Sequence, residues 1–186
     1  MRSWTLLFYC AITLYTPLMA AQANSAVTAD VDQLFSGLAQ ATSEIEAASL
    51  RHKIEHIWLD GDGPTLSLLM SRAQQAAAGQ NYGVALTLLN QTIKLAPDWA
   101  EAWNRRAGLR SQLGDEVGAL TDLSRALSLE PRHFDALATQ GQILKHQDKK
   151  MDALKAFLVA LQLCPNWPEL ETQVKALKRE VEGQDI

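Results

Sequence analysis

The stretch "AWNRRAGLRSQLGDEVGALTDLSRALSLEP", residues 102–131, contains two helical patterns on either side of the turn-forming pair Gly114-Asp115. In the second pattern, small and apolar residues recur at helical spacing on one face: Ala119, Leu120, Leu123, Ala126 and Leu127. Pro131 then prevents the helix from continuing. The stretch therefore predicts a helical hairpin with an apolar side that a neighbouring element must cover.

The surrounding sequence repeats this hairpin with a period of 34 residues. The clearest columns are Pro97, Pro131 and Pro165; Ala85, Ala119 and Ala153; Leu86, Leu120 and Leu154; and Trp99, His133 and Trp167. A fixed period of this length indicates stacked repeats that bury their open faces against one another. It predicts three units over residues 66–99, 100–133 and 134–167 within a repeat region at 65–167.

Residues 102–131 resemble a tetratricopeptide repeat (TPR). The matching positions are Trp103, Ala107, Gly114-Asp115, Ala119, Ala126 and Pro131. The third unit has Asp148 where the turn glycine is usual, and the first unit has Gly79 one place early. The resemblance covers about residues 66–167 and implies an all-α fold, an α-solenoid of three TPR helix hairpins.

The flanking segments are predicted to be caps. Residues 168–186 begin with Pro168 and carry an apolar stripe, which predicts a C-terminal capping helix followed by a tail. In residues 24–64, an amphipathic helix over 31–40 precedes a capping box of Ser43 and Glu46, which opens a helix to about Leu59. We expect this N-terminal helical hairpin to cover the first repeat.

Residues 1–23 have the pattern of a secretory signal peptide. Arg2 precedes an uncharged stretch from Trp4 to Ala21, and small residues follow at the positions that a signal peptidase reads. We expect cleavage after Ala23 and an exported chain, periplasmic or secreted, that resembles small TPR proteins of Gram-negative bacteria. An uncleaved anchor is the alternative. After cleavage Cys164 is the only thiol, and we expect it to be an apolar filler.

Composition limits the classes of partner. The chain has 186 residues, and its 17 Lys and Arg are outnumbered by 21 Asp and Glu, for a formal net charge of −4. No basic field points to nucleic acid, and no membrane insertion is expected after signal cleavage.

The sequence "RHKIEHIWLDGDGPT", residues 51–65, raises the question of a metal site. His52, Glu55 and His56 have the order that inverted zinc peptidases use. Helical geometry places both histidines opposite the apolar stripe of Ile54, Ile57 and Trp58, so we expect them to face water. We predict no metal and no cofactor. The following residues are predicted to be a connector in which Gly61 ends one helix, Pro64 stops it and Thr65 caps the next.

The TPR resemblance implies a concave groove that holds a peptide or protein. Its positions here are Met70, Gln74, Glu101, Asn104, Gly108, Ser111, Gln112, Asp135, Ala138, Gln142, Lys145 and His146, to which we add Arg105 as a candidate to receive a carboxylate.

Three other arginines have simpler interpretations. We expect Arg106 and Arg72 to cover the seam between helices with their stems, and Arg110 to be solvated. Binding of chaperone tails is disfavoured, because Asp135 and Thr139 replace the Lys and Arg of the TPR subclass that clamps a C-terminal carboxylate.

The sequence thus predicts a non-enzymatic interaction scaffold that binds an unidentified protein or peptide in its groove. One alternative is a structural or assembly subunit of an envelope complex with no groove ligand. The other is a zinc-dependent hydrolase that uses His52, Glu55 and His56.

Overall fold

The structure, a computed structural model, describes residues 30–60 and 63–183, and all regular secondary structure in these ranges is helical. Residues 30–40 form the first helix. The others are α2 (Glu44–Leu59), α3 (Pro64–Ala78), α4 (Tyr82–Leu95), α5 (Ala100–Gln112), α6 (Glu116–Leu129), α7 (Phe134–His146), α8 (Lys150–Leu163) and α9 (Pro168–Glu182). No helix in this part of the chain is long and apolar enough to cross a membrane. The signal peptide predicted at 1–23 and the helix end predicted at Gly61 lie outside the described residues.

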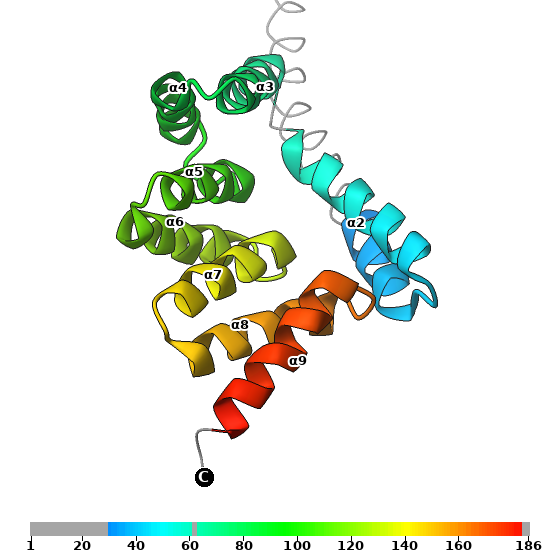
Figure 1. The fold of residues 1–186 in the computed structure, drawn as a ribbon. Helices are drawn as coiled ribbons and strands as arrows, with labels where there is room; N and C mark the ends of the chain where they lie inside the picture. The colour runs from blue at the N-terminus through cyan, green and yellow to red at the C-terminus, as the bar shows by residue number, and fades with distance from the viewer. Residues whose placement is uncertain (1–29, 61–62, 184–186) are drawn as a thin grey trace, which may run out of the picture.

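Helices α3 to α8 form three stacked hairpins, as the 34-residue period predicts. Helix α3 packs on α4, α5 on α6 and α7 on α8, and each hairpin contacts the next. Figure 1 shows these hairpins stacked in chain order, with α9 covering the last of them. Helix α9 buries Leu170, Val174 and Leu177 against the third hairpin, so the predicted C-terminal cap is confirmed. The predicted all-α solenoid is therefore confirmed.

The turn inside each hairpin uses one left-handed residue at the same place in the period. These residues are Gln80, Gly114 and Asp148, with φ of 61°, 83° and 58°. In the first unit Gly79 ends α3 with φ −80°, and Gln80 after it takes the left-handed conformation. The first and third hairpins thus keep the turn geometry that glycine favours without having glycine there.

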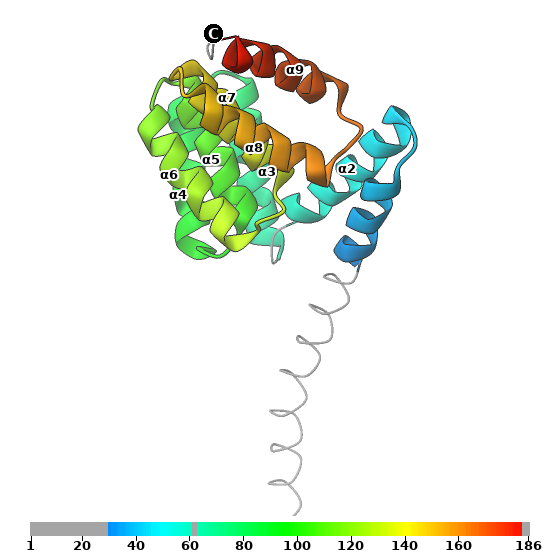
Figure 2. The same ribbon diagram turned by 90° about the horizontal axis from the view of Figure 1, so that it is seen from below.

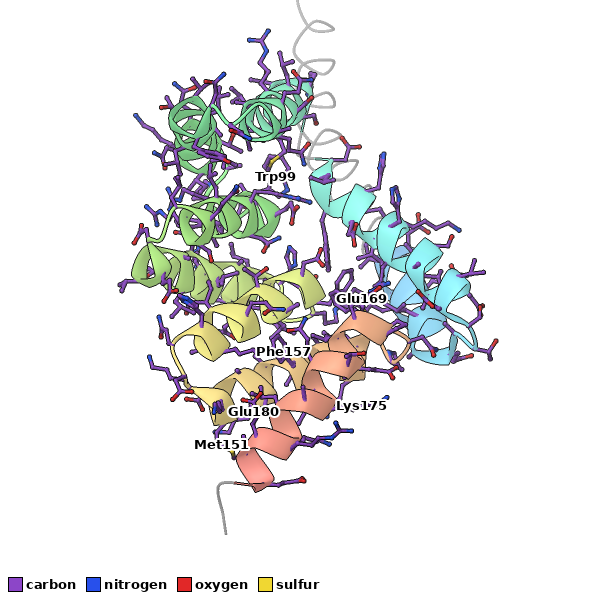
Figure 3. All side chains as sticks on the ribbon, viewed as in Figure 1. Trp99, Met151, Phe157, Glu169, Lys175 and Glu180 are labelled. Carbon is purple, nitrogen blue, oxygen red and sulfur yellow. The ribbon has the colours of Figure 1, made fainter. Side chains whose placement is uncertain are left out.

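The third hairpin has its own pairing of small and large residues. A Cβ on Gly141 would lie 2.3 Å from Cε1 of the fully buried Phe157, which packs between α7 and α8 (Figure 3). One period earlier, Ala107 and Leu123 share a core cluster at the equivalent positions. The larger ring of Phe157 therefore requires the smaller residue opposite it.

Gly141→Ala is expected to lower the free energy of unfolding by about 2 kcal/mol, because overpacking a filled core forces side chains from their preferred rotamers. Urea denaturation of the purified protein measures this. Adding Phe157→Leu reproduces the pair of the second hairpin, and the double variant should be more stable than Gly141→Ala alone. A double variant that is less stable than both single variants would refute this packing argument.

The N-terminal hairpin lies elsewhere than predicted. We name residues 30–59 the strap: the first helix together with α2. Its apolar residues, among them Phe35 and Ile54, form a core cluster with Phe134 and Cys164 of the third hairpin and with Trp167. The prediction that this hairpin covers the first repeat is wrong, since only the end of α2, at Leu59, packs into the core of the first hairpin. Figures 1 and 2 show α2 running from α3 toward α9, beside the stacked hairpins.

The ends of α2 and α3 can be compared with the predicted connector. Ser43 caps α2 by accepting a hydrogen bond from the Glu46 N–H at 3.2 Å, as predicted. Helix α2 ends at Leu59, with Asp60 as its C-cap. Thr65 does not cap α3, because Pro64 already occupies the first helical position and Gly63 precedes it.

Candidate functional site

The strap is attached to the repeats through one column of the period, Trp99, His133 and Trp167. Each of these residues is the N-cap of a helix, α5, α7 and α9 respectively. Trp99 lies beside the end of α2 (Figure 3), where its Nε1–H donates to the Trp58 carbonyl at 2.7 Å. The His133 ring stacks on Trp58 with centroids 4.2 Å apart. The guanidinium of Arg51 lies 4.5 Å from the Trp167 ring centroid.

Polar contacts add to this attachment at the third hairpin. Arg132 binds Asp32 at 2.6 Å and lies over the Phe35 ring. The side chain of Asn166 donates to the Ala41 carbonyl at 2.6 Å. The strap is therefore part of the folded core, with both aromatic and hydrogen-bonded anchors.

A hollow of about 780 Å³ lies between the strap and the first helices of the repeats. We name this cavity the hollow. It is lined by Glu55, Met70, Ala73, Gln74, Ala77, Leu89, Asn104, Arg105, Gly108, Leu109, Gln112, Asp135, Ala138, Thr139, Gln142 and Trp167. Its volume is in the range of pockets that hold small ligands or a few residues of a peptide.

Most of the predicted groove positions line this hollow. They are Met70, Gln74, Asn104, Arg105, Gly108, Gln112, Asp135, Ala138 and Gln142. Glu101, Ser111, Lys145 and His146 are not in its lining. Glu101 is buried at 3% exposure, and His146 binds Glu116 at the start of α6 instead. Which of the lining side chains touch a ligand stays a prediction.

Glu101 anchors a buried polar network beneath the hollow. Its carboxylate accepts hydrogen bonds from Asn104 Nδ2 at 3.1 Å, from His133 Nε2 at 2.8 Å and from Arg105 Nε. The Ala136 N–H donates to Nδ1 of His133, so Nε2 carries a proton toward Glu101. Burial acts to raise the pKa of Glu101, but the hydrogen bond from His133 and the charge of Arg105 outweigh it and lower that pKa. Glu101 is thus an ionised structural group.

Comparison with known proteins agrees with the fold and the period. A TPR repeat-containing protein of Rhizobium etli is 34% identical over 161 residues, which cover 87% of this chain and 79% of that protein. The chain belongs to the tetratricopeptide-repeat family. Tetratricopeptide repeat protein 36 of Xenopus tropicalis is 34% identical over 115 residues, and the match spans 57% of that protein. No family model matches the chain.

A solved TPR structure has the same arrangement of helices. The first TPR domain of Spaghetti (RPAP3), bound to an HSP90 peptide, superposes with a TM-score of 0.62 over 65% of this chain and 96% of that domain. The two sequences are 18% identical, so this likeness establishes the TPR fold alone.

The second TPR hairpin contains a charge network that the sequence did not predict. Asp122 is 1% exposed, and Arg106 binds it with two parallel hydrogen bonds of 2.8 Å, from Nε and from Nη2. Arg110 donates to the same carboxylate at 2.9 Å, so the prediction that Arg110 is solvated is wrong. Arg106 also reaches Asn90 of the preceding hairpin at 2.7 Å. Arg72, one period before Arg106, is exposed, and the prediction that its stem covers the seam stays a prediction.

A signal for this network is present in the period. Asp122 lies in the column of Leu88 and Ala156, which makes it a charged residue at a position that is apolar in the other two hairpins. A buried carboxylate at an apolar position requires a cation beside it. Arg106 is one period after Arg72 and has a stem long enough to reach it.

The residues of α2 that resemble a zinc-peptidase motif, His52, Glu55 and His56, lie on two different faces of the helix. His52 and His56 are exposed, as their helical positions predict, whereas Glu55 lines the hollow. No group of three or more His, Cys, Asp or Glu in residues 30–60 and 63–183 is arranged to hold a metal ion. Cys164 is fully buried in the core cluster of the strap, and burial raises the pKa of its thiol to about 12. It fills space, as predicted.

Proposed function

We propose that this TPR protein is a non-enzymatic interaction scaffold that holds a short peptide segment of a partner protein in the hollow. The observation that carries the proposal is the hollow itself, formed by the first helices of all three hairpins and bounded by Glu55 of the strap. A TPR domain of the same fold is bound to an HSP90 peptide, which supports this class of ligand. The signal-like pattern at 1–23 supports export to the periplasm or beyond as part of the same proposal.

The mixed lining suits a peptide. The partly exposed Ala77 and Trp167 offer apolar surface, while Gln74 and Gln142 offer side-chain amides that can bond a peptide backbone. The strap bounds the hollow on one side, so an extended segment fits this space better than the face of a folded domain. No catalytic arrangement is needed for such a function.

Gly108 provides a direct test. It lies within α5 and lines the hollow, and a Cβ at this position would meet no atom within 4 Å. Gly108→Leu should therefore place its side chain in the hollow without a clash at Cβ, and should raise the free energy of unfolding by roughly 0.5–1 kcal/mol because glycine weakens a helix. We expect at least a tenfold loss of the proteins captured from an extract of the source cells by the immobilised chain, together with a higher melting temperature.

Gly83→Leu is the matched control. Gly83 lies in α4 outside the hollow and also has open space around its Cα. This variant should capture the same proteins as the wild type. If Gly108→Leu captures them equally well, the hollow is not the binding site. The result would then favour an assembly subunit that uses its outer face.

A further inference from the structure

The hollow has two chemically different regions. Met70, Leu89 and Leu109, contributed by α3, α4 and α5, provide an apolar wall. Glu55 of α2 and Asp135 of α7 place two carboxylates in the same lining. Because these acids come from helices far apart in the chain, the negative charge is a product of the strap crossing to the third hairpin.

Neither of these carboxylates is neutralised by the protein. Within residues 30–60 and 63–183, Glu55 and Asp135 have no side-chain hydrogen bond and no ion pair. Arg105 is the one cationic residue among the described residues of the lining, and Glu101 already binds its Nε. The lining therefore has two carboxylates without a partner and one guanidinium that the buried Glu101 already binds.

The ionisation of Asp135 reflects this imbalance. Burial and the nearby charge of Glu55 raise the pKa of Asp135 to about 6, against the weaker lowering effects of His133 and Arg105. In the absence of a ligand, the ionised form of Asp135 is therefore less stable, relative to the protonated form, than in an ordinary aspartate. A cation placed beside it would remove that disadvantage.

We propose that the hollow selects a peptide segment with a lysine or arginine side chain that lies between Glu55 and Asp135. This inference rests on the proposed function, because it names the chemistry of the ligand in the same hollow. A cationic side chain there gains charge-assisted hydrogen bonds to two free carboxylates. An acidic side chain or a C-terminal carboxylate would be repelled by both, and would find Arg105 already engaged by Glu101.

The test uses an octapeptide positional-scanning library, acetylated and amidated so that the termini carry no charge. Each fluorescent sublibrary is titrated with residues 24–186, which is the chain without the predicted signal peptide. We expect lysine or arginine at one position to bind about tenfold more tightly than glutamate there, which corresponds to one charge-assisted contact. For the lysine sublibrary, affinity should rise from pH 5 to pH 7, because Asp135 loses its proton over this range and only its ionised form attracts the cation.

Two variants assign the effect to the named carboxylates. Asp135→Asn and Glu55→Gln should each reduce the preference for lysine over glutamate several-fold, and Asp135→Asn should flatten the pH dependence. Asp98→Asn is the matched control, since Asp98 is exposed before α5 and does not line the hollow. It should leave the preference unchanged. Melting temperatures of all three variants show whether they remain folded.

The outcomes separate this inference from the proposed function. Peptide binding with no preference for basic residues, or with a preference for acidic ones, would overturn the inference and leave the scaffold function standing. Absence of binding in every sublibrary would overturn both. A basic preference that persists in Asp135→Asn and in Glu55→Gln would also overturn the inference, because another site would then hold the cation.

Discussion

Replacing Asp122 with alanine is expected to lower the free energy of unfolding by about 3 kcal/mol, which is a large share of the stability of a small domain. The substitution leaves Arg106, which is 12% exposed, without the carboxylate that accepts both of its parallel hydrogen bonds. Arg110 is 28% exposed and can turn toward solvent, so the loss should lie at the lower end of the range for breaking a buried ion pair. Urea denaturation with tryptophan fluorescence measures the change.

Asp98→Ala, at an exposed position, is the matched control and should change stability by less than about 0.5 kcal/mol. The double variant Arg106→Leu with Asp122→Ala separates loss of the pair from loss of packing. It replaces Asp122 with the alanine that stands one period later, at Ala156, and replaces Arg106 with an apolar side chain. An apolar pair is often as stable as a buried ion pair. The double variant should therefore recover most of the lost stability. If it is less stable than Asp122→Ala alone, the network contributes more than charge compensation.

The array itself could be predicted from the sequence because its contacts are local and periodic. Each hairpin packs on itself and on the next, so columns such as Ala85, Ala119 and Ala153 report directly on the helix crossings. The C-terminal helix was equally predictable, since its apolar stripe has only the last hairpin to cover.

The position of the strap could not be predicted in the same way. The stripe of Ile54, Ile57 and Trp58 predicts the buried face of α2, but an apolar stripe does not show which element covers it. The actual partner, Phe134, lies about two periods further along the sequence. Helix α2 extends from the first hairpin, where Leu59 packs, to the third hairpin, so its buried face meets residues far along the chain (Figure 1).

The column of Trp99, His133 and Trp167 contained a signal for this contact. Three large ring side chains at helix N-caps are unusual, since short polar residues are preferred there. A ring at each junction between hairpins indicates a surface that another element covers. The TPR resemblance predicted most of the residues that line the hollow. It could not predict Glu55, because Glu55 belongs to the strap and not to a repeat.

The last prediction concerns the attachment of the strap at Trp58. Its ring stacks on His133 and lies 5.0 Å, between centroids, from the fully buried Phe134. Trp58→Ala removes these contacts but keeps the carbonyl that Trp99 binds. Truncation of a core tryptophan destabilises by about 3–5 kcal/mol, and since Trp58 is half-buried we expect about 3 kcal/mol of weaker strap attachment.

This loss should be local, because the repeats have core clusters of their own. In hydrogen exchange followed by mass spectrometry, α2 should lose protection by about two orders of magnitude, which corresponds to 3 kcal/mol, while α5 and α6 keep theirs. Ile45→Ala is the control, since Ile45 lies on the same helix at 84% exposure. This variant should leave the exchange protection of α2 unchanged. Equal loss of protection in α2 and α6 would show that strap and repeats unfold together. Each time α2 opens in this way, Glu55 leaves the lining, and the hollow is then an open groove with only one of its two free carboxylates.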